Sequence, residues 1–332
     1  MIDRRTFLAG TGAVLLAAPL AAEAQQAGKV ARVGYVATTT PVSEMTGPHP
    51  RHPPIRDLLK ALRAIGWIEG QNLILERRSA EGRFERFGDI LRELVALPCD
   101  VIMTVGAAMT EEALRITSTI PIAFTALDPI AFGIVTSLAR PGRNITGVLG
   151  TGPEFAGKEL ELFREAVPKA RRMAVLAHPV AWKGFYGEAL RAAASRLAMT
   201  LLYVESGPGD YAQAFAAITE QRAQAIFVGW GAYLFADRHH IIEFAIKKRL
   251  PLMGQGTPFT EAGALLSYNV NNTEYWARMA YYIDRLLRGV KPADLPIEQP
   301  TKFELVINLK TAKALGLTIP PSLLGRADEV IQ

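Results

Sequence analysis

Five histidines and one cysteine are the residues of this 332-residue chain whose types best support metal binding or nucleophilic catalysis. His49 and His52 flank a proline–arginine pair in a proline-rich loop, and His239 and His240 are neighbours in a segment with helical character. Neighbouring residues of a helix point apart, so this second pair lacks the i, i+4 spacing that chelates one zinc ion. The chain contains no H-E-x-x-H, G-x-S-x-G or phosphate-binding P-loop motif. The sequence therefore predicts no catalytic residues, no metal site and no cofactor.

The single cysteine and the composition exclude further classes of protein. Cys99 cannot form a disulfide within the chain, and its place between Pro98 and Asp100, before an apolar run, favours a buried structural thiol over a nucleophile. Apolar residues make up 49% of the chain and charged residues 21%, as in ordinary globular proteins. The net charge of +5 comes without an arginine-rich tract interleaved with aromatics, so we expect no nucleic-acid partner.

The candidate ligand residues follow from where apolar, strand-like runs end. In open parallel sheets, ligands bind beyond the carboxyl ends of the strands. A helix is expected to begin after the strand that ends near Gly106, and a helix N-terminus favours an anion such as a carboxylate. Aromatic residues at later strand ends would wall the rest of a small-molecule pocket. The predicted ligand-binding residues are Thr38, Thr39, Gly106, Ala107, Ala108, Asp128, Trp182, Trp230, Tyr233, Gln255, Ser267 and Tyr268.

Some of these residues have a structural alternative. Trp182 could instead cover a surface helix, and Asp128 could be a turn residue before Pro129. Lys183, beside Trp182, could pair with an anionic group or simply be solvated.

The elements that would position these residues alternate regularly. Strands are predicted at 30–36, 72–76, 100–105, 121–124, 172–177, 201–204, 225–228, 251–253 and 264–268. Helices are predicted at 55–65, 84–97, 109–116, 154–167, 187–197, 211–222, 237–248 and 272–287. This alternation indicates an α/β fold with parallel sheets wound on both sides. The break near Pro141–Asn144 separates two similar lobes.

The N-terminus carries an export signal. Arg4 and Arg5 precede a short apolar run at 9–22, and an Ala-x-Ala step ends at Ala24. This pattern is typical of a twin-arginine signal peptide cleaved after Ala24, which predicts a periplasmic mature protein. An uncleaved N-terminal anchor is the alternative.

Several segments resemble one family. They are IGWIEGQN at 65–72, AEGR at 80–83, DPI at 128–130, SLARPGRNITG at 137–147, QPTKFELVINLK at 299–310 and IPP at 319–321. Together they are similar to ABC-transporter substrate-binding proteins of the tryptophan/tyrosine-binding type, which have the type I periplasmic-binding fold. The loops at 40–54 and 178–183 depart from the family pattern.

The resemblance implies two Rossmann-like lobes joined by a three-segment hinge. The chain would divide into a signal peptide at 1–24 and two lobes. The N-terminal lobe would comprise 28–147 plus about 270–297, and the C-terminal lobe and hinge segment would comprise 148–269 plus about 298–332. It implies a monomer that captures an amino acid or aromatic carboxylate and delivers it to a membrane permease. Two alternatives stay open: a ligand-sensing subunit for a membrane receptor, and a periplasmic hydrolase, which would need a nucleophile–base pair that the sequence does not offer.

Overall fold

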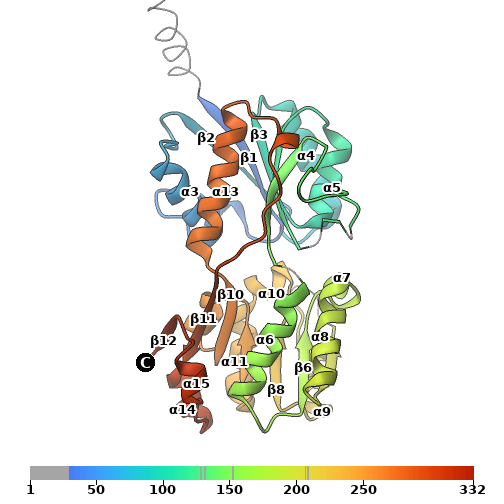
Figure 1. The fold of residues 1–332 in the computed structure, drawn as a ribbon, viewed down its shortest axis with the longest axis vertical. Helices are drawn as coiled ribbons and strands as arrows, with labels where there is room; N and C mark the ends of the chain where they lie inside the picture. The colour runs from blue at the N-terminus through green and yellow to red at the C-terminus, as the bar shows by residue number, and fades with distance from the viewer. Residues whose placement is uncertain (1–29, 128, 131, 152, 206, 208) are drawn as a thin grey trace, which may run out of the picture.

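A computed structural model describes residues 30–332, except 128, 131, 152, 206 and 208. It contains a five-stranded and a seven-stranded sheet, each in its own lobe (Figure 1). Most neighbouring strands run parallel, so the predicted two-lobed α/β fold is confirmed.

The first lobe is built on a wholly parallel sheet with the strand order β2-β1-β3-β4-β5. Its strands are β1 (Ala31–Ala37), β2 (Leu73–Ser79), β3 (Val101–Val105), β4 (Ile122–Ala126) and β5 (Ile145–Leu149). Its helices are α2 (Val42–Met45), α3 (Pro53–Ala64), α4 (Phe87–Ala96), α5 (Ala107–Ile116) and α13 (Asn272–Leu287), with two 3₁₀ turns, η1 (Phe84–Arg86) and η2 (Pro292–Asp294). Helices α3 and α13 bury one face of the sheet, and α4 and α5 bury the other.

The second lobe has the strand order β12-β11-β10-β9-β8-β6-β7. Its strands are β6 (Arg172–Leu176), β7 (Thr200–Val204), β8 (Ala225–Val228), β9 (Leu252–Gly254), β10 (Leu266–Val270), β11 (Phe303–Asn308) and β12 (Glu329–Ile331). Its helices are α6 (Pro153–Ala166), α7 (Pro179–Lys183), α8 (Phe185–Arg196), α9 (Ala212–Glu220), α10 (Ala232–Ala236), α11 (Arg238–Lys248), α12 (Thr257–Glu261), α14 (Leu309–Leu315) and α15 (Pro321–Leu324). Strand β11 is antiparallel to β10, so this sheet is mixed rather than wholly parallel.

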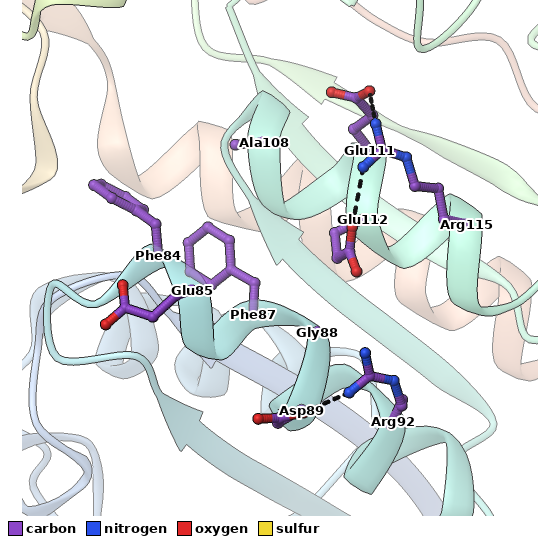
Figure 2. Close-up of a pocket in the computed structure, with 10 residues that line it drawn as sticks. All are labelled: Phe84, Glu85, Phe87, Gly88, Asp89, Arg92, Ala108, Glu111, Glu112 and Arg115. Atoms are coloured by element: carbon purple, nitrogen blue, oxygen red, sulfur yellow. Dashed lines mark hydrogen bonds and ion pairs between the residues drawn. The ribbon is translucent and has the colours of Figure 1, made fainter.

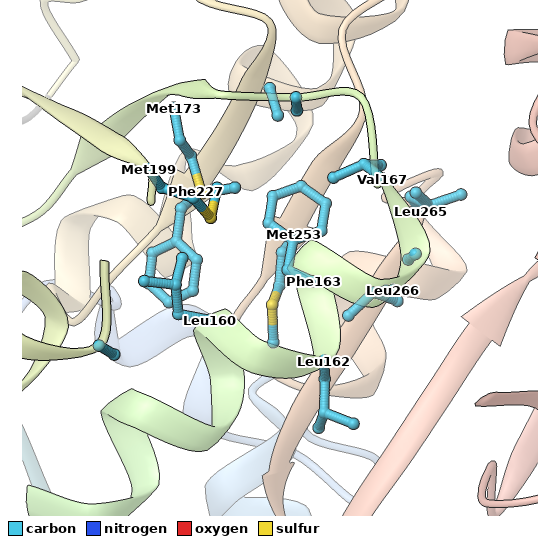
Figure 3. Close-up of a cluster of buried hydrophobic side chains, with 14 of the residues drawn as sticks. Leu160, Leu162, Phe163, Val167, Met173, Met199, Phe227, Met253, Leu265 and Leu266 are labelled. Atoms are coloured by element: carbon cyan, nitrogen blue, oxygen red, sulfur yellow. The ribbon is translucent and has the colours of Figure 1, made fainter. Parts of the chain in front are cut away.

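The second lobe also has a core on each face of its sheet. On one face, Leu160 and Phe163 of α6 pack against Phe227 of β8 and Met253 of β9 (Figure 3). On the other face, α9 to α12 cover side chains such as Ile226.

The chain passes between the lobes three times: from β5 to α6, from β10 to α13, and from the end of the first lobe into β11 (Figure 1). Backbone hydrogen bonds join these crossings. The amide of Leu149 donates to the carbonyl of Glu298 at 2.8 Å, and the amide of Asn271 donates to the carbonyl of Lys302 at 3.0 Å. The Arg278 guanidinium also pairs with the Glu298 carboxylate. A cavity of about 420 Å³ lies among these segments.

The predicted elements agree with the structure in kind, and their ends mostly differ by one or two residues. The helix at 272–287 and the strand at 225–228 have the predicted bounds. The single helix predicted at 84–97 is wrong at its start, where η1 precedes α4. Strand β5 was not predicted, because Gly147 interrupts its apolar pattern. The four- and five-residue helices at several strand ends are too short to show periodicity.

Candidate ligand-binding cleft

Thr38 and Gly106 lie in the loops at the carboxyl ends of β1 and β3 in the first lobe's sheet. Thr38 and Thr39 follow β1 and are half-buried, and the Thr38 carbonyl accepts a hydrogen bond from the Gly82 amide at 2.8 Å. Gly106 lies between β3 and α5 with φ of 91°, a conformation that favours glycine.

Helix α5 begins at Ala107, where the sequence predicts an anion site. The first intrahelical bond runs from the Thr110 amide to the Gly106 carbonyl at 3.2 Å. The amides before Thr110 therefore lack a helical acceptor and point out of the helix end. Ala107 is half-buried and Ala108 is exposed. The Gly106 amide itself donates to the Thr125 carbonyl at 2.7 Å, so only the amides of the first turn of α5 are left for the predicted slot, which stays a prediction.

Trp230 and Tyr233 lie at the end of β8 in the second lobe. The Trp230 ring is half-buried, and its Cη2 atom lies 3.8 Å from where a Cβ on Gly150 would stand. Gly150 belongs to the first crossing segment, so Trp230 sits beside the hinge. Tyr233 is only 4% exposed, and its ring centroid lies 5.9 Å from that of His178.

Trp182 is engaged by its own lobe. Its ring stacks on Tyr203 with centroids 4.9 Å apart and planes 3° apart. The Arg191 guanidinium lies 4.8 Å from the Trp182 ring centroid, and Arg191 also donates to the Trp182 carbonyl at 3.0 Å. These contacts favour the structural alternative, in which Trp182 covers β7 and α8.

Gln255, Ser267 and Tyr268 also have partners within the second lobe. The Ser267 side chain is fully buried and its hydroxyl accepts a hydrogen bond from Thr260 at 2.7 Å. Gln255 is 8% exposed and donates to the Gly229 carbonyl. Tyr268 stacks on Phe155 with centroids 5.2 Å apart and is near Phe303 beside the hinge. These contacts hold the three side chains within the second lobe. The remaining candidate, Asp128, lies outside the described residues.

Two contacts between the lobes involve residues that the sequence analysis did not select. The Phe84 ring of η1 meets the His178 ring at the end of β6, with centroids 6.1 Å apart and planes 82° apart. The Arg238 guanidinium of α11 interacts electrostatically with Glu44 of α2. Burial lowers the pKa of Arg238, and the negative charges of Glu44 and Glu261 oppose that shift. The Nε atom of Arg238 has no hydrogen-bond partner among the described residues. An aromatic residue directly after AEGR was the available signal for Phe84.

A groove of about 410 Å³ runs between α4 and α5 on the first lobe (Figure 2). Phe84 and Phe87 line one wall, and Ala108 lies on the opposite helix. Further along, Arg115 pairs with Glu111 at 2.5 Å. The groove therefore opens beside the amides at the start of α5.

Metal-binding clusters and membrane-spanning helices are both absent from the described parts of the chain. No group of three or more histidine, cysteine, aspartate or glutamate residues there could hold a metal ion. Among the helices that the structure describes, none is long and apolar enough to cross a membrane. Cys99 is buried, and burial raises the pKa of its thiol to about 11, so the thiol stays protonated near neutral pH.

Comparisons with known proteins agree with this architecture. The tyrosine-binding protein of Clostridioides difficile is 23% identical over 266 residues, which cover 79% of this chain and 76% of that protein. A conserved domain protein of Vibrio cholerae is 26% identical, with a TM-score of 0.80 over 91% of this chain and 100% of that one. The ABC domain of Streptococcus pneumoniae in complex with L-Trp is 22% identical, with a TM-score of 0.78 over 91% and 99% of the two chains. The model of the ABC transporter substrate binding protein family matches residues 49–331, so this chain belongs to that family of solute receptors.

Proposed function

We propose that this protein captures an amino acid or a small aromatic carboxylate between its lobes and, as a monomer, presents it to the permease of an ABC importer. The observation that supports this proposal is that α5 begins at the carboxyl end of β3 in one lobe, while the aromatic residues Trp230 and Tyr233 follow the carboxyl end of β8 in the other. Tyrosine and L-Trp, the ligands of two relatives, each combine a carboxylate, which suits a helix N-terminus, with an aromatic ring.

The carboxylate would bind the amides of Ala107 and Ala108, which follow Gly106, because the Gly106 amide already donates to the Thr125 carbonyl at 2.7 Å. Main-chain donors and the helix dipole both favour a negative charge at this place. Thr38 and Thr39 lie at the next strand end and would add hydroxyl hydrogen bonds. Asp128, which the sequence predicts to contact the ligand, is our proposed partner for a ligand amine.

The apolar body of the solute would lie against the second lobe. Trp230 is a half-buried aromatic that follows β8 and would meet the solute, while the buried Tyr233, in the short helix α10 that comes next, would support the pocket. Trp182, Gln255, Ser267 and Tyr268 would then support the pocket through their contacts within the lobe.

Titration calorimetry on the purified mature protein with tryptophan, tyrosine, leucine and benzoate tests this proposal. Ala107→Asp places a carboxylate at the proposed slot, so we expect affinity to fall at least about tenfold, roughly 1.4 kcal/mol. Ala192→Asp, on an exposed position of α8, is the matched control and should bind like the wild type. Lack of binding by every probe would refute the function, whereas unchanged affinity in Ala107→Asp would refute only the carboxylate slot.

We also propose export to the periplasm through Arg4 and Arg5, with cleavage after Ala24. Replacing both residues, Arg4→Lys with Arg5→Lys, should leave the precursor in the cytoplasm because the twin-arginine signal is lost. Cell fractionation and N-terminal sequencing check this. A normal periplasmic yield of the double variant would contradict the proposed route.

A further inference from the structure

Phe84 is an exposed aromatic residue held in a fixed place at the edge of the cleft. It begins η1 directly after the loop that follows β2, and its side chain is 45% exposed. The ring of buried Phe87 packs edge-on against the Phe84 ring, with centroids 5.5 Å apart. Within the preceding loop, the Arg83 amide donates to the Ala80 carbonyl at 3.0 Å. The backbone therefore presents the Phe84 ring from an ordered turn.

This turn lies beside both candidate elements of the first lobe. Gly82, two residues before Phe84, donates to the Thr38 carbonyl at 2.8 Å. Phe84 and Ala108 line the same 410 Å³ groove (Figure 2). The ring thus stands near the threonine loop and near the amides at the start of α5.

Across the cleft, Phe84 is the first of three rings that connect the lobes. The His178 ring lies edge-on to the Phe84 ring, with centroids 6.1 Å apart, and the centroid of the Tyr233 ring lies 5.9 Å from that of His178. Tyr233 is 4% exposed, so little of its ring can meet a solute in this arrangement. Phe84 retains far more accessible surface, and it belongs to the lobe that carries the carboxylate slot.

Building on the proposed function, we propose that Phe84 is the first lobe's contact with the ring of an aromatic solute and that it determines the preference for aromatic over aliphatic solutes. An aromatic pair contributes binding energy beyond the area that it buries. Because Phe84 lies edge-on to His178 of the second lobe, a solute ring against Phe84 would be near both lobes at once. An aliphatic side chain would gain only the apolar burial.

Calorimetric titration of tyrosine, leucine and benzoate into the wild type, Phe84→Ala and Phe84→Leu tests this inference. We expect Phe84→Ala to bind tyrosine and benzoate about fivefold more weakly and leucine less than twofold more weakly. The affinity of Phe84→Leu for tyrosine and benzoate should lie between those of the wild type and Phe84→Ala. Phe132→Ala is the matched control: Phe132 is also an aromatic of the first lobe, 39% exposed, with no ring contact among the described residues.

Each alternative outcome has a distinct meaning. Equal losses for tyrosine and leucine in Phe84→Ala would reduce Phe84 to a lobe-closing contact and overturn the inference. Unchanged affinity for the aromatic probes would overturn it as well. If the wild type binds none of the probes, the proposed function fails together with the inference. If it binds leucine but neither aromatic probe, only the inference fails, and both results are seen before any variant is made. Circular dichroism and thermal unfolding verify that the variants keep the fold.

Discussion

His52 combines burial with a ring nitrogen that has no hydrogen-bond partner among the described residues. It precedes α3, and its ring lies edge-on to Tyr35 with centroids 6.4 Å apart. Burial lowers the pKa of His52 from 6.5 to about 4. The folded protein therefore keeps His52 neutral at pH values where the unfolded chain already protonates it.

This difference makes folding stability depend on pH. Between about pH 6.5 and about pH 4 the unfolded state binds more protons, so the free energy of unfolding falls as the pH falls through that window. We expect the wild type to lose about 1–2 kcal/mol from this group between pH 7.5 and pH 5. Urea unfolding of the wild type and of His52→Gln at both pH values measures this loss. The free energy of unfolding of the variant should fall less than that of the wild type. His239→Gln, at an exposed position, is the control and should behave like the wild type.

Trp182 and Phe84 show what residue type alone does not reveal. Both are large aromatics near strand ends, and the sequence selects only Trp182 as a candidate ligand residue. In the structure, Tyr203 and Arg191 cover the Trp182 ring, while Phe84 stays exposed and reaches the opposite lobe. Residue type thus predicts the presence of an aromatic surface, whereas its accessibility depends on neighbours distant in sequence.

At the scale of elements, the pairing of β4 with β5 depends on a glycine. A Cβ on Gly147 would stand 2.0 Å from the Phe124 carbonyl oxygen, which belongs to the neighbouring strand. The Gly147 carbonyl also accepts a hydrogen bond from Glu298 in the third crossing. The close approach of two backbones therefore positions both the sheet edge and a hinge segment.

Gly147→Ala should destabilise the protein by about 3 kcal/mol, because the two strands must move apart. Gly157→Ala is a matched control: a Cβ there would meet its nearest neighbour, an Arg196 nitrogen, at 3.6 Å, and the position is inside α6. That control should be neutral or stabilising by up to about 1 kcal/mol. Denaturant unfolding compares the two variants, and a Gly147→Ala midpoint equal to that of the wild type would show that the strands tolerate the methyl group.

At the scale of the whole molecule, the cores of the two lobes are largely separate. The buried clusters of the first lobe contain one residue of the second lobe's strands, Val270 at the end of β10, with Phe303 of β11 packed beside it, and both lie next to the crossing segments. The lobes are connected through the crossing segments and through contacts such as Phe84 with His178. Each lobe therefore has the packing of an independently folding unit.

Calorimetry should accordingly show unfolding that is not two-state. We expect the measured enthalpy to exceed the van't Hoff enthalpy, since the lobes can melt in separate steps. A bound solute that contacts both lobes should couple these steps and raise the transition temperature. A single two-state transition without solute would contradict this prediction and would indicate strong coupling through the hinge.

The sequence by itself determines the class of the fold and of the protein. The alternation of apolar strands with amphipathic helices specifies parallel sheets, because each element must bury one face or both. The motifs at 65–72, 137–147 and 299–310 specify the family, and the matched family model spans 49–331. Elements such as α13 were predictable to the residue because its apolar stripe is long and Asn271 caps its start.

Only the tertiary structure decided which side chains face the cleft. The sequence predicts Ser267 and Tyr268 at a strand end, whereas β10 continues to Val270 and their side chains contact Thr260 and Phe155 within the lobe. The antiparallel pairing of β11 with β10 likewise joins distant parts of the chain. The pattern of apolar residues along a helix or strand indicates which of its residues are buried. The meeting of Phe84 with His178 depends on how two separately folded lobes are held by three crossings, and no local pattern encodes that placement.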